Sequence, residues 1–170
     1  TERGIGLARL VQNAPDDEFR AKLGEWMDVD QFLRFTAVNV ALANCDSPLM
    51  IGHNFYLWEN PATHRMIWIP WDLNEAFGAF PGAGSPSRQV ELSIQQPYAR
   101  DGSLFERILN VPEWQQSYRR HLAGLLDTAF RLEVLQSRVD QMAALLRPAA
   151  REESRQALDR FEIGVGDRDL

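Results

Sequence analysis

The sequence predicts a predominantly helical α+β fold with one β-hairpin. Apolar residues recur at helical spacing through most of the 170-residue chain. Two neighbouring segments rich in strand-forming residues, 55–58 and 65–70, interrupt this pattern. A glycine-, proline- and serine-rich loop at 78–102 separates them from a second helical region. At 45% apolar residues, a chain of this length can bury a core without disulfide bonds.

The first part of the chain is expected to form three helices. Residues 5–12 have amphipathic spacing, and a second helix is predicted to begin at Pro15, where three acidic residues follow the proline. Residues 30–44 are apolar around almost the whole circumference, which is typical of a buried helix. Because Pro48 prevents continuation, we expect this segment to be the central core helix.

The second part of the chain is expected to be helical beyond the hairpin and the long loop. Four further helices are predicted, at 104–109, 114–125, 132–146 and 150–161. The short break between the second and third of these predicts an antiparallel pair, with the third helix ending before Pro148. Residues 163–170 are expected to be a flexible tail.

Composition excludes several classes of protein. The net charge of −6 and the pI of about 5.1 argue against a duplex nucleic acid or an anionic membrane as partner. The single cysteine excludes an internal disulfide framework, and no apolar stretch approaches the ~18 residues of a membrane span. Because the chain begins at Thr1, we expect it to be processed or to be part of a longer protein; oligomeric state stays open.

The residues that could carry chemistry gather between positions 44 and 78. Asp46 follows the core helix, Asn54 precedes the first strand and Asp72 follows the second strand. Because a hairpin brings the start of one strand beside the end of the next, we expect Asn54 and Asp72 to face one pocket with Asp46 at its mouth. Their oxygen atoms suit Mg²⁺ or Mn²⁺. A second, metal-free carboxylate can orient an attacking hydroxyl in phosphoryl transfer.

Structural roles compete with these chemical ones. Asp46 could stabilise a turn, and Asp72 could cap a helix in a capping box with Glu75. Cys45 could be a nucleophile, but no histidine has the spacing of a triad, so a packing role is favoured. The hairpin tryptophans could form a stacking platform or cover a helix. The only lysine, Lys22, lies in a polar helical pattern that does not suit a buried catalytic amine.

Two segments resemble the CotH protein-kinase family, which is named for a bacterial spore-coat protein. They are residues 53–58 (HNFYLW) and 69–78 (IPWDLNEAFG), and the resemblance extends over roughly residues 5–160. It implies a protein-kinase-like C-terminal lobe, over residues 1–162, whose hairpin carries the metal-site loop. It also implies metal-dependent phosphoryl transfer from ATP to a hydroxyl of a protein substrate, such as a coat or surface protein, at an extracellular or spore-associated location.

The resemblance implies a role for each matching residue. Asp46 would orient the substrate hydroxyl, and Asp72 would bind Mg²⁺ or Mn²⁺ with Asn54 as a second ligand. Three further residues would contribute to binding the nucleotide: Asn74, Trp68 and Trp71. Asn74 stands where many family members carry a second acid, which weakens neutralisation of the metal charge if this position is a ligand.

One part of a kinase is missing from the sequence. An active kinase needs an N-terminal lobe with a lysine on a strand, whereas the first ~45 residues here are expected to be helical. We therefore expect the chain to be part of a longer protein and not to be a competent kinase alone. Two alternatives stay open: a non-catalytic spore-coat or cell-surface binding module, and a metal-dependent hydrolase that uses Asp46 and Asp72 as an acid–base pair.

Overall fold

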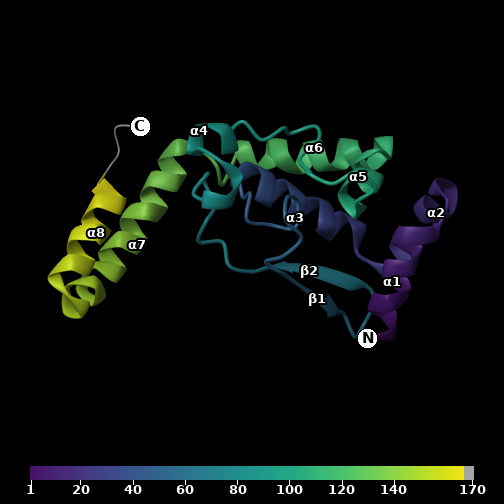
Figure 1. Ribbon diagram of the computed structural model, residues 1–170, viewed down its shortest axis with the longest axis horizontal. Coiled ribbons are helices and arrows are strands. Elements are labelled where there is room, and N and C mark those ends of the chain that lie inside the picture. Colours follow the sequence, from purple (N-terminus) through teal and green to yellow (C-terminus); the bar gives the residue numbers. More distant parts are fainter. Residues whose placement is uncertain (167–170) are drawn as a thin grey trace. The chain divides into compact units, whose positions relative to one another are not determined.

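The computed structural model describes residues 1–166 (Figure 1). It confirms a predominantly helical α+β fold with one two-stranded antiparallel sheet. The chain divides into two compact units, Thr1–Gly124 and Leu125–Leu170. The single lobe over residues 1–162 stays a prediction. The physical reason for the division is that the last two helices pack on each other. Each unit is described by itself.

Three helices open the first unit, close to the predicted positions. They are α1 (Glu2–Asn13), α2 (Asp16–Trp26) and α3 (Val29–Ala41). The Thr1 hydroxyl accepts the Gly4 N–H at the start of α1, and the Asp28 carboxylate accepts the Gln31 N–H at the start of α3. Helices α1 and α2 pack against each other. Seven residues of α3 are buried, so α3 is the central core helix that its apolar circumference predicts.

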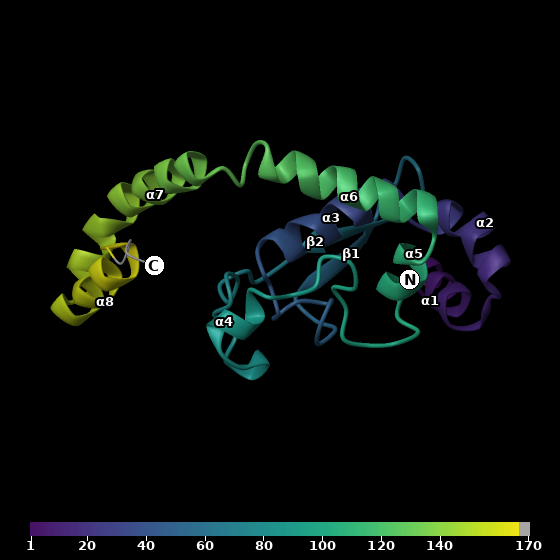
Figure 2. The ribbon, with the colours of Figure 1, turned by 90° about the horizontal axis from the view of Figure 1, so that it is seen from above.

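The hairpin consists of β1 (Phe55–Glu59) and β2 (Met66–Pro70). The two strands are antiparallel, with Phe55 opposite Pro70 and Glu59 opposite Met66. Strand β2 packs against α3, and β1 lies on the side of β2 away from that helix (Figures 1 and 2). The hairpin is therefore held to the core through one strand.

Trp68 on β2 is the centre of an aromatic cluster. Its ring stacks on Phe55 at 4.3 Å between centroids and meets Phe32 edge-on at 5.1 Å. Phe35 and Phe105 complete the cluster, Phe105 being on α5 (Leu104–Leu109). These rings join α3, the hairpin and α5 into one core.

The segment after the hairpin is irregular, as predicted, but it is tied down at several points. It contains η1 (Pro81–Ala83) and α4 (Pro86–Gln89). The buried Gln89 side chain donates to the carbonyls of Phe80 and Gly84, at 2.7 and 3.0 Å. The next long helix, α6 (Pro112–Leu126), contributes Tyr118, whose hydroxyl donates to the Ile94 carbonyl at 3.0 Å. These bonds fix the loop to the first unit.

The second unit contains α7 (Leu132–Glu153) and α8 (Arg155–Gly166), which pack on each other. An ion pair joins Arg147 to Glu162 at 2.7 Å. The sequence predicted an antiparallel pair of the 114–125 and 132–146 helices; within the second unit, the helix that packs on α7 is α8. Helix α7 also continues through Pro148, where the sequence predicted its end, although an interior proline removes a helical hydrogen bond and crowds the preceding turn.

The predicted tail needs a correction as well. Residues 163–166 belong to α8, where the sequence predicted a flexible tail from 163. The apolar Ile163 and Val165 continue the helical pattern, which outweighs the two glycines at 164 and 166. Residues 167–170 of the predicted tail lie outside the described residues.

Candidate functional site

Asp46 lies in the turn region that follows α3 and is 8% exposed. Its Oδ1 atom is 2.9 Å from Nε2 of His53. The Asn54 Nδ2 group donates to Asp46 Oδ2 at 2.8 Å and to the Asp46 main-chain carbonyl at 2.9 Å. Two of the predicted site residues are therefore in direct contact, and both oxygens of the Asp46 carboxylate are held in place.

Asp72 lies at the open end of the same hairpin. The Trp71 N–H donates to the Asn54 carbonyl at 3.1 Å, which extends the ladder one step beyond the Phe55–Pro70 pair. Asp72 is the next residue along the chain and its side chain is exposed. The structure thus confirms that the hairpin brings the Asn54 and Asp72 segments side by side.

Two further contacts fix these segments to the end of α3. The Phe77 N–H donates to the Leu42 carbonyl at 2.6 Å, which ties the loop after Asp72 to the last turn of the helix. The buried Asn44 is bonded twice to Asn39, from its N–H to the carbonyl at 3.0 Å and from Nδ2 to Oδ1 at 2.9 Å. Because Asn44 is two residues before Asp46, these bonds set the path of the chain into the site.

Backbone conformations around the site are unusual. Outside glycine, the described residues with positive φ number five, and four of them are at this end of the fold: Ala43, Asn54, Asp72 and Phe77. Their φ values run from 45° to 60°, a left-handed region that is costly for a residue with a Cβ atom. Such conformations persist only where the surrounding structure imposes them, and they gather at binding and catalytic sites.

The capping role considered for Asp72 is not found. Among the described residues, no α-helix begins directly after Asp72, and residues 74–79 form turns. The left-handed φ of 52° at Asp72 also differs from the extended backbone of an N-cap residue. The Asp72 carboxylate is therefore not used as a helix cap.

The three residues expected to bind nucleotide fall into two environments. Trp68 is 7% exposed and is enclosed by the aromatic core, so its ring faces are not available to a ligand. The prediction that Trp68 contacts a nucleotide is corrected on this ground. Trp71 is 56% exposed and contacts Tyr56 edge-on at 5.3 Å. Asn74 is exposed in the turns that follow Asp72.

The donor set fits a hard cation only when the ligand itself supplies further oxygens. Among residues 1–166, no group of three or more histidine, cysteine or acidic side chains is placed to hold a metal ion. Since Asn54 Nδ2 is used by Asp46, its Oδ1 is the side-chain atom left for a cation, alongside the exposed Asp72 carboxylate. Mg²⁺ commonly binds through one or two protein oxygens together with phosphate oxygens and water.

Cys45 and His53 both lie close to Asp46, but only His53 contacts its carboxylate. Cys45 is 2% exposed, and burial raises the pKa of its thiol, which disfavours the nucleophilic thiolate. This agrees with its predicted packing role. His53 contacts Asp46 through its ring, which was not predicted from the sequence. Its position directly before Asn54 was the one signal that could have placed it at the site.

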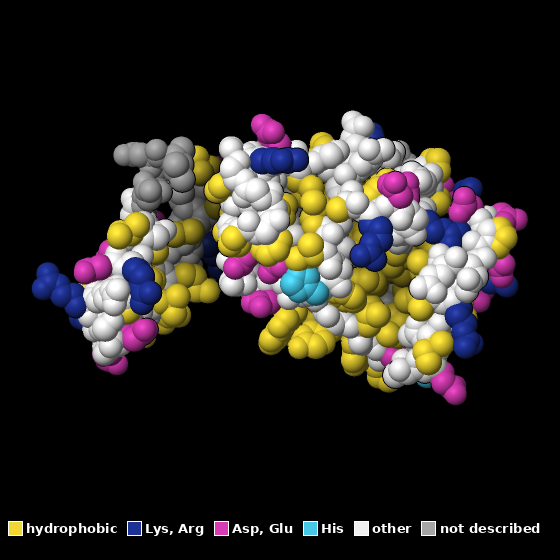
Figure 3. Space-filling model, viewed as in Figure 1, with side chains coloured by type: hydrophobic (Ala, Val, Ile, Leu, Met, Phe, Trp, Pro, Cys, Tyr) yellow, Lys and Arg dark blue, Asp and Glu magenta, His cyan; other side chains and the backbone are white. Residues whose placement is uncertain are grey.

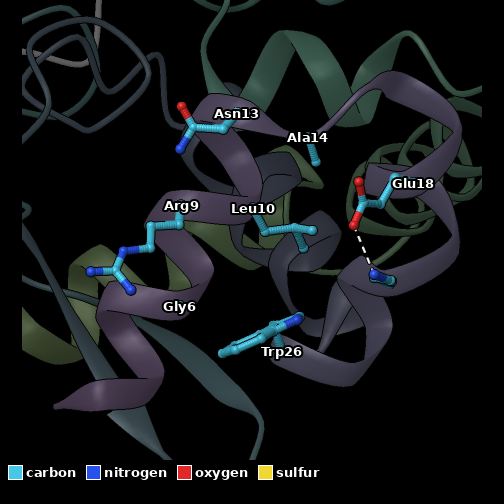
Figure 4. Close-up of a pocket in the computed structure, with 8 residues that line it drawn as sticks. Gly6, Arg9, Leu10, Asn13, Ala14, Glu18 and Trp26 are labelled. Atoms are coloured by element: carbon cyan, nitrogen blue, oxygen red, sulfur yellow. Dashed lines mark hydrogen bonds and ion pairs between the residues drawn. The ribbon is translucent and has the colours of Figure 1, made fainter.

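A separate pocket of about 420 Å³ lies between α1 and α2 (Figure 4). Lys22 lines it and is paired with Glu18 at 2.7 Å. The hydrogen bond to Glu18 raises the pKa of Lys22. The pair with Glu18 favours the protonated amine, which disfavours a role of Lys22 as a catalytic base. None of the predicted site residues lines this pocket.

Comparison with known proteins shows the family to which the chain belongs. Residues 5–163 match the family described as CotH kinase protein. The chain belongs to the CotH family. It is 27% identical over 139 residues to "Inner spore coat protein H" of Bacillus subtilis (strain 168), and the match covers 81% of this chain and 36% of that relative. The chain thus spans about a third of that relative's length. No described helix is both long and apolar enough to cross a membrane.

Proposed function

We propose that this CotH chain carries the hydroxyl-orienting and metal-binding residues of an ATP-dependent protein kinase. The observation that carries the proposal is the junction of Asp46, Asn54 and the Asp72 segment at one end of the hairpin, through bonds of 2.8 to 3.1 Å. In this arrangement one carboxylate is held by protein hydrogen bonds and a second is exposed, which suits the first to orient a hydroxyl and the second to bind a metal ion.

Each residue has a distinct part in this proposal. Asp46 accepts the hydrogen bond of a substrate hydroxyl, and its orientation is fixed by His53 and Asn54. Asp72 and Asn54 Oδ1 hold Mg²⁺ or Mn²⁺, which would neutralise charge on the phosphates of ATP. Trp71, exposed beside Asp72, is the remaining aromatic candidate for a nucleotide contact. The substrate is a protein hydroxyl, and by analogy with the relative the protein is associated with the spore.

Titration calorimetry of Mn²⁺ and ATP into the chain tests this proposal. Asp72→Ala should weaken binding of the Mn²⁺–ATP pair by about 10–100-fold, because it removes a charged ligand. The far-UV circular dichroism should stay unchanged, since the Asp72 side chain is exposed and caps no helix. Asp101→Ala is the matched control, an exposed acid in the loop before α5.

Asp46→Asn separates the two carboxylates. It should leave the Mn²⁺–ATP affinity within about twofold, because Asp46 is proposed to act on the hydroxyl and not on the metal. Unchanged affinity in Asp72→Ala would remove Asp72 as a metal ligand. Binding in neither variant nor wild type would favour the second candidate function, a binding module of the coat or cell surface. That alternative is favoured by the exposed aromatic side chains of the hairpin, Tyr56, Trp58 and Trp71.

A further inference from the structure

The two edges of the hairpin differ in how their backbone groups are used. Two backbone bonds show which residues of the strands pair with each other through hydrogen bonds. The Trp71 N–H donates to the Asn54 carbonyl, and the Asn60 N–H donates to the Arg65 carbonyl. In this pairing the even-numbered residues of β1 are bonded to β2, and the odd-numbered ones direct their N–H and C=O groups away from it. The outward residues on β1 are Phe55, Leu57 and Glu59, and those on β2 are Met66, Trp68 and Pro70.

The chain closes the outer edge of β2 by itself. The Gln31 side chain pairs with both backbone groups of Trp68, donating to the carbonyl at 2.6 Å and accepting the N–H at 3.0 Å. The Asp28 N–H donates to the Met66 carbonyl at 3.1 Å. Pro70 has no N–H to satisfy. A side-chain amide and the start of α3 thus take the place of a neighbouring strand.

The outer edge of β1 is left open. Within residues 1–166, the outward N–H and C=O groups of Phe55, Leu57 and Glu59 have no hydrogen-bond partner. The strand contains no lysine, no proline and no bulge, three of the features with which proteins protect such an edge, and its one charged residue is Glu59 at its end. Its three central residues are 40% to 53% exposed, so the edge is accessible.

One face of the hairpin beside this edge is wholly apolar. The side chains that alternate onto it are Tyr56, Trp58, Ile67, Ile69 and Trp71. Four of them are 41% to 56% exposed. Hydrophobic side chains gather on the surface at the hairpin (Figure 3). A segment paired with β1 would therefore also find a surface on which apolar side chains can pack.

We propose that the open edge of β1 binds an extended segment of a partner protein as a third strand. The row of backbone donors and acceptors requires another extended backbone, and the adjoining face favours apolar side chains at every second position of that segment. This inference does not depend on phosphoryl transfer.

A second copy of the chain fits this edge poorly. Pairing β1 with its own copy about a two-fold axis at Leu57 would set each Phe55 opposite a Glu59 of the other copy, and both copies carry a net charge of −6. The same charge favours a partner segment with basic residues at its ends.

The first test measures binding of a labelled synthetic peptide by fluorescence anisotropy. The probe has ten residues, with alternating valine and threonine and a lysine at each end. Leu57→Pro removes one outward N–H and places the proline ring at the edge without breaking a β1–β2 bond. We expect it to weaken peptide binding at least tenfold, roughly the loss of a hydrogen bond together with a steric block. Leu57→Ala, the matched control, keeps the N–H and should bind within about threefold of wild type.

A second test uses only the wild-type chain, so it holds even if Leu57→Pro fails to fold. Two versions of the probe carry N-methyl groups on alternate residues, one on the valines and one on the threonines. In a paired strand, the N–H groups of every second residue point toward the neighbouring strand. Methylation of those N–H groups should abolish binding, whereas methylation of the alternate ones should leave it intact. Binding should also slow amide exchange at Phe55, Leu57 and Glu59.

Three results would overturn the proposal. They are equal affinity of Leu57→Pro and Leu57→Ala, equal binding of the two methylated probes, and unchanged amide exchange at the β1 edge at the highest soluble concentration of the probe. Sedimentation of the chain alone gives a separate check. A dimer that Leu57→Pro dissociates would assign the edge to a second copy and exclude the partner segment.

Discussion

The two compact units differ in how they use their apolar residues. Every buried hydrophobic residue of the described chain except Ala143 belongs to the first unit. In the second unit, the apolar side chains of α7 and α8 are largely exposed: Leu132, Val139, Met142, Leu145, Leu146 and Ile163. The same helical periodicity therefore accompanies a tight core in one unit and an exposed stripe in the other. Burial of side chains therefore contributes much less to the second unit than to the first.

Trp68→Ala should have the largest effect, because it removes the ring at the centre of the aromatic core. We expect a loss of about 3–5 kcal/mol in the free energy of unfolding of the first unit. Urea titration followed by far-UV circular dichroism measures this loss. The matched control is Trp71→Ala, whose ring is 56% exposed and which should cost within about 0.5 kcal/mol. Equal losses in the two variants would contradict the placement of Trp68 in the core.

Gln31→Ala should have the next largest effect on the first unit. It removes both bonds to the Trp68 backbone and leaves a buried N–H and C=O without partners. The expected cost is about 1–3 kcal/mol in the same urea titration. Gln31→Glu keeps the acceptor but sets a carboxylate oxygen against the Trp68 carbonyl, so it should cost at least as much as Gln31→Ala. A cost no larger than that of Gln12→Ala, an exposed position on α1, would contradict the role of Gln31 as an edge cap.

The sequence was sufficient to predict the hairpin and the core helix, because both depend on local periodicity. It also predicted that Asn54 and the Asp72 segment lie together, since antiparallel pairing alone brings them to one end of the sheet. The direct bond from Asn54 to Asp46 was not predicted, because it depends on how the turn after α3 meets the hairpin.

Other features depend on contacts between distant segments and could not be predicted. Strand alternation puts Trp68 and Trp71 on opposite faces of the hairpin, and the rings of Phe32 and Phe105 show which face is the inner one. The role of Gln31 could not be predicted either, because its bond to Trp68 depends on where β2 lies relative to α3. Likewise, a proline is a good signal for the end of a helix, but α7 keeps its other bonds through Pro148.

The buried Tyr118 should make the stability of the first unit depend on pH. Burial raises the pKa of Tyr118 to about 12 from the ordinary 10.0. Between these two values the unfolded chain loses the phenolic proton while the folded chain retains it, so stability is full below pH 10 and falls as the pH rises toward 12. Tyr118→Phe should cost about 1 kcal/mol at neutral pH, through the bond to Ile94, and should remove this part of the alkaline fall.

Denaturant titrations of wild type and Tyr118→Phe at a series of alkaline pH values measure the difference directly. The stability advantage of wild type should shrink above pH 10, because only wild type has the buried phenol to ionise. Parallel curves over that range would show that Tyr118 is not buried in the unit. Tyr98, whose pKa is also raised by burial, is present in both proteins and cancels in the comparison.

Leu145→Ala should have the smallest effect, and it tests the second unit. The Leu145 side chain on α7 is 71% exposed, so little burial is lost, and alanine favours a helix at least as well as leucine. We expect a change within about 0.5 kcal/mol in the opening free energy of α7 amides, measured by hydrogen exchange. A loss above about 1 kcal/mol would mean that this side chain is buried in solution. The apolar side chains of α7 would then be covered in solution by a surface that is absent from the exposed fraction of Leu145. The two units would then differ in what covers their apolar residues, and not in how much apolar surface they bury.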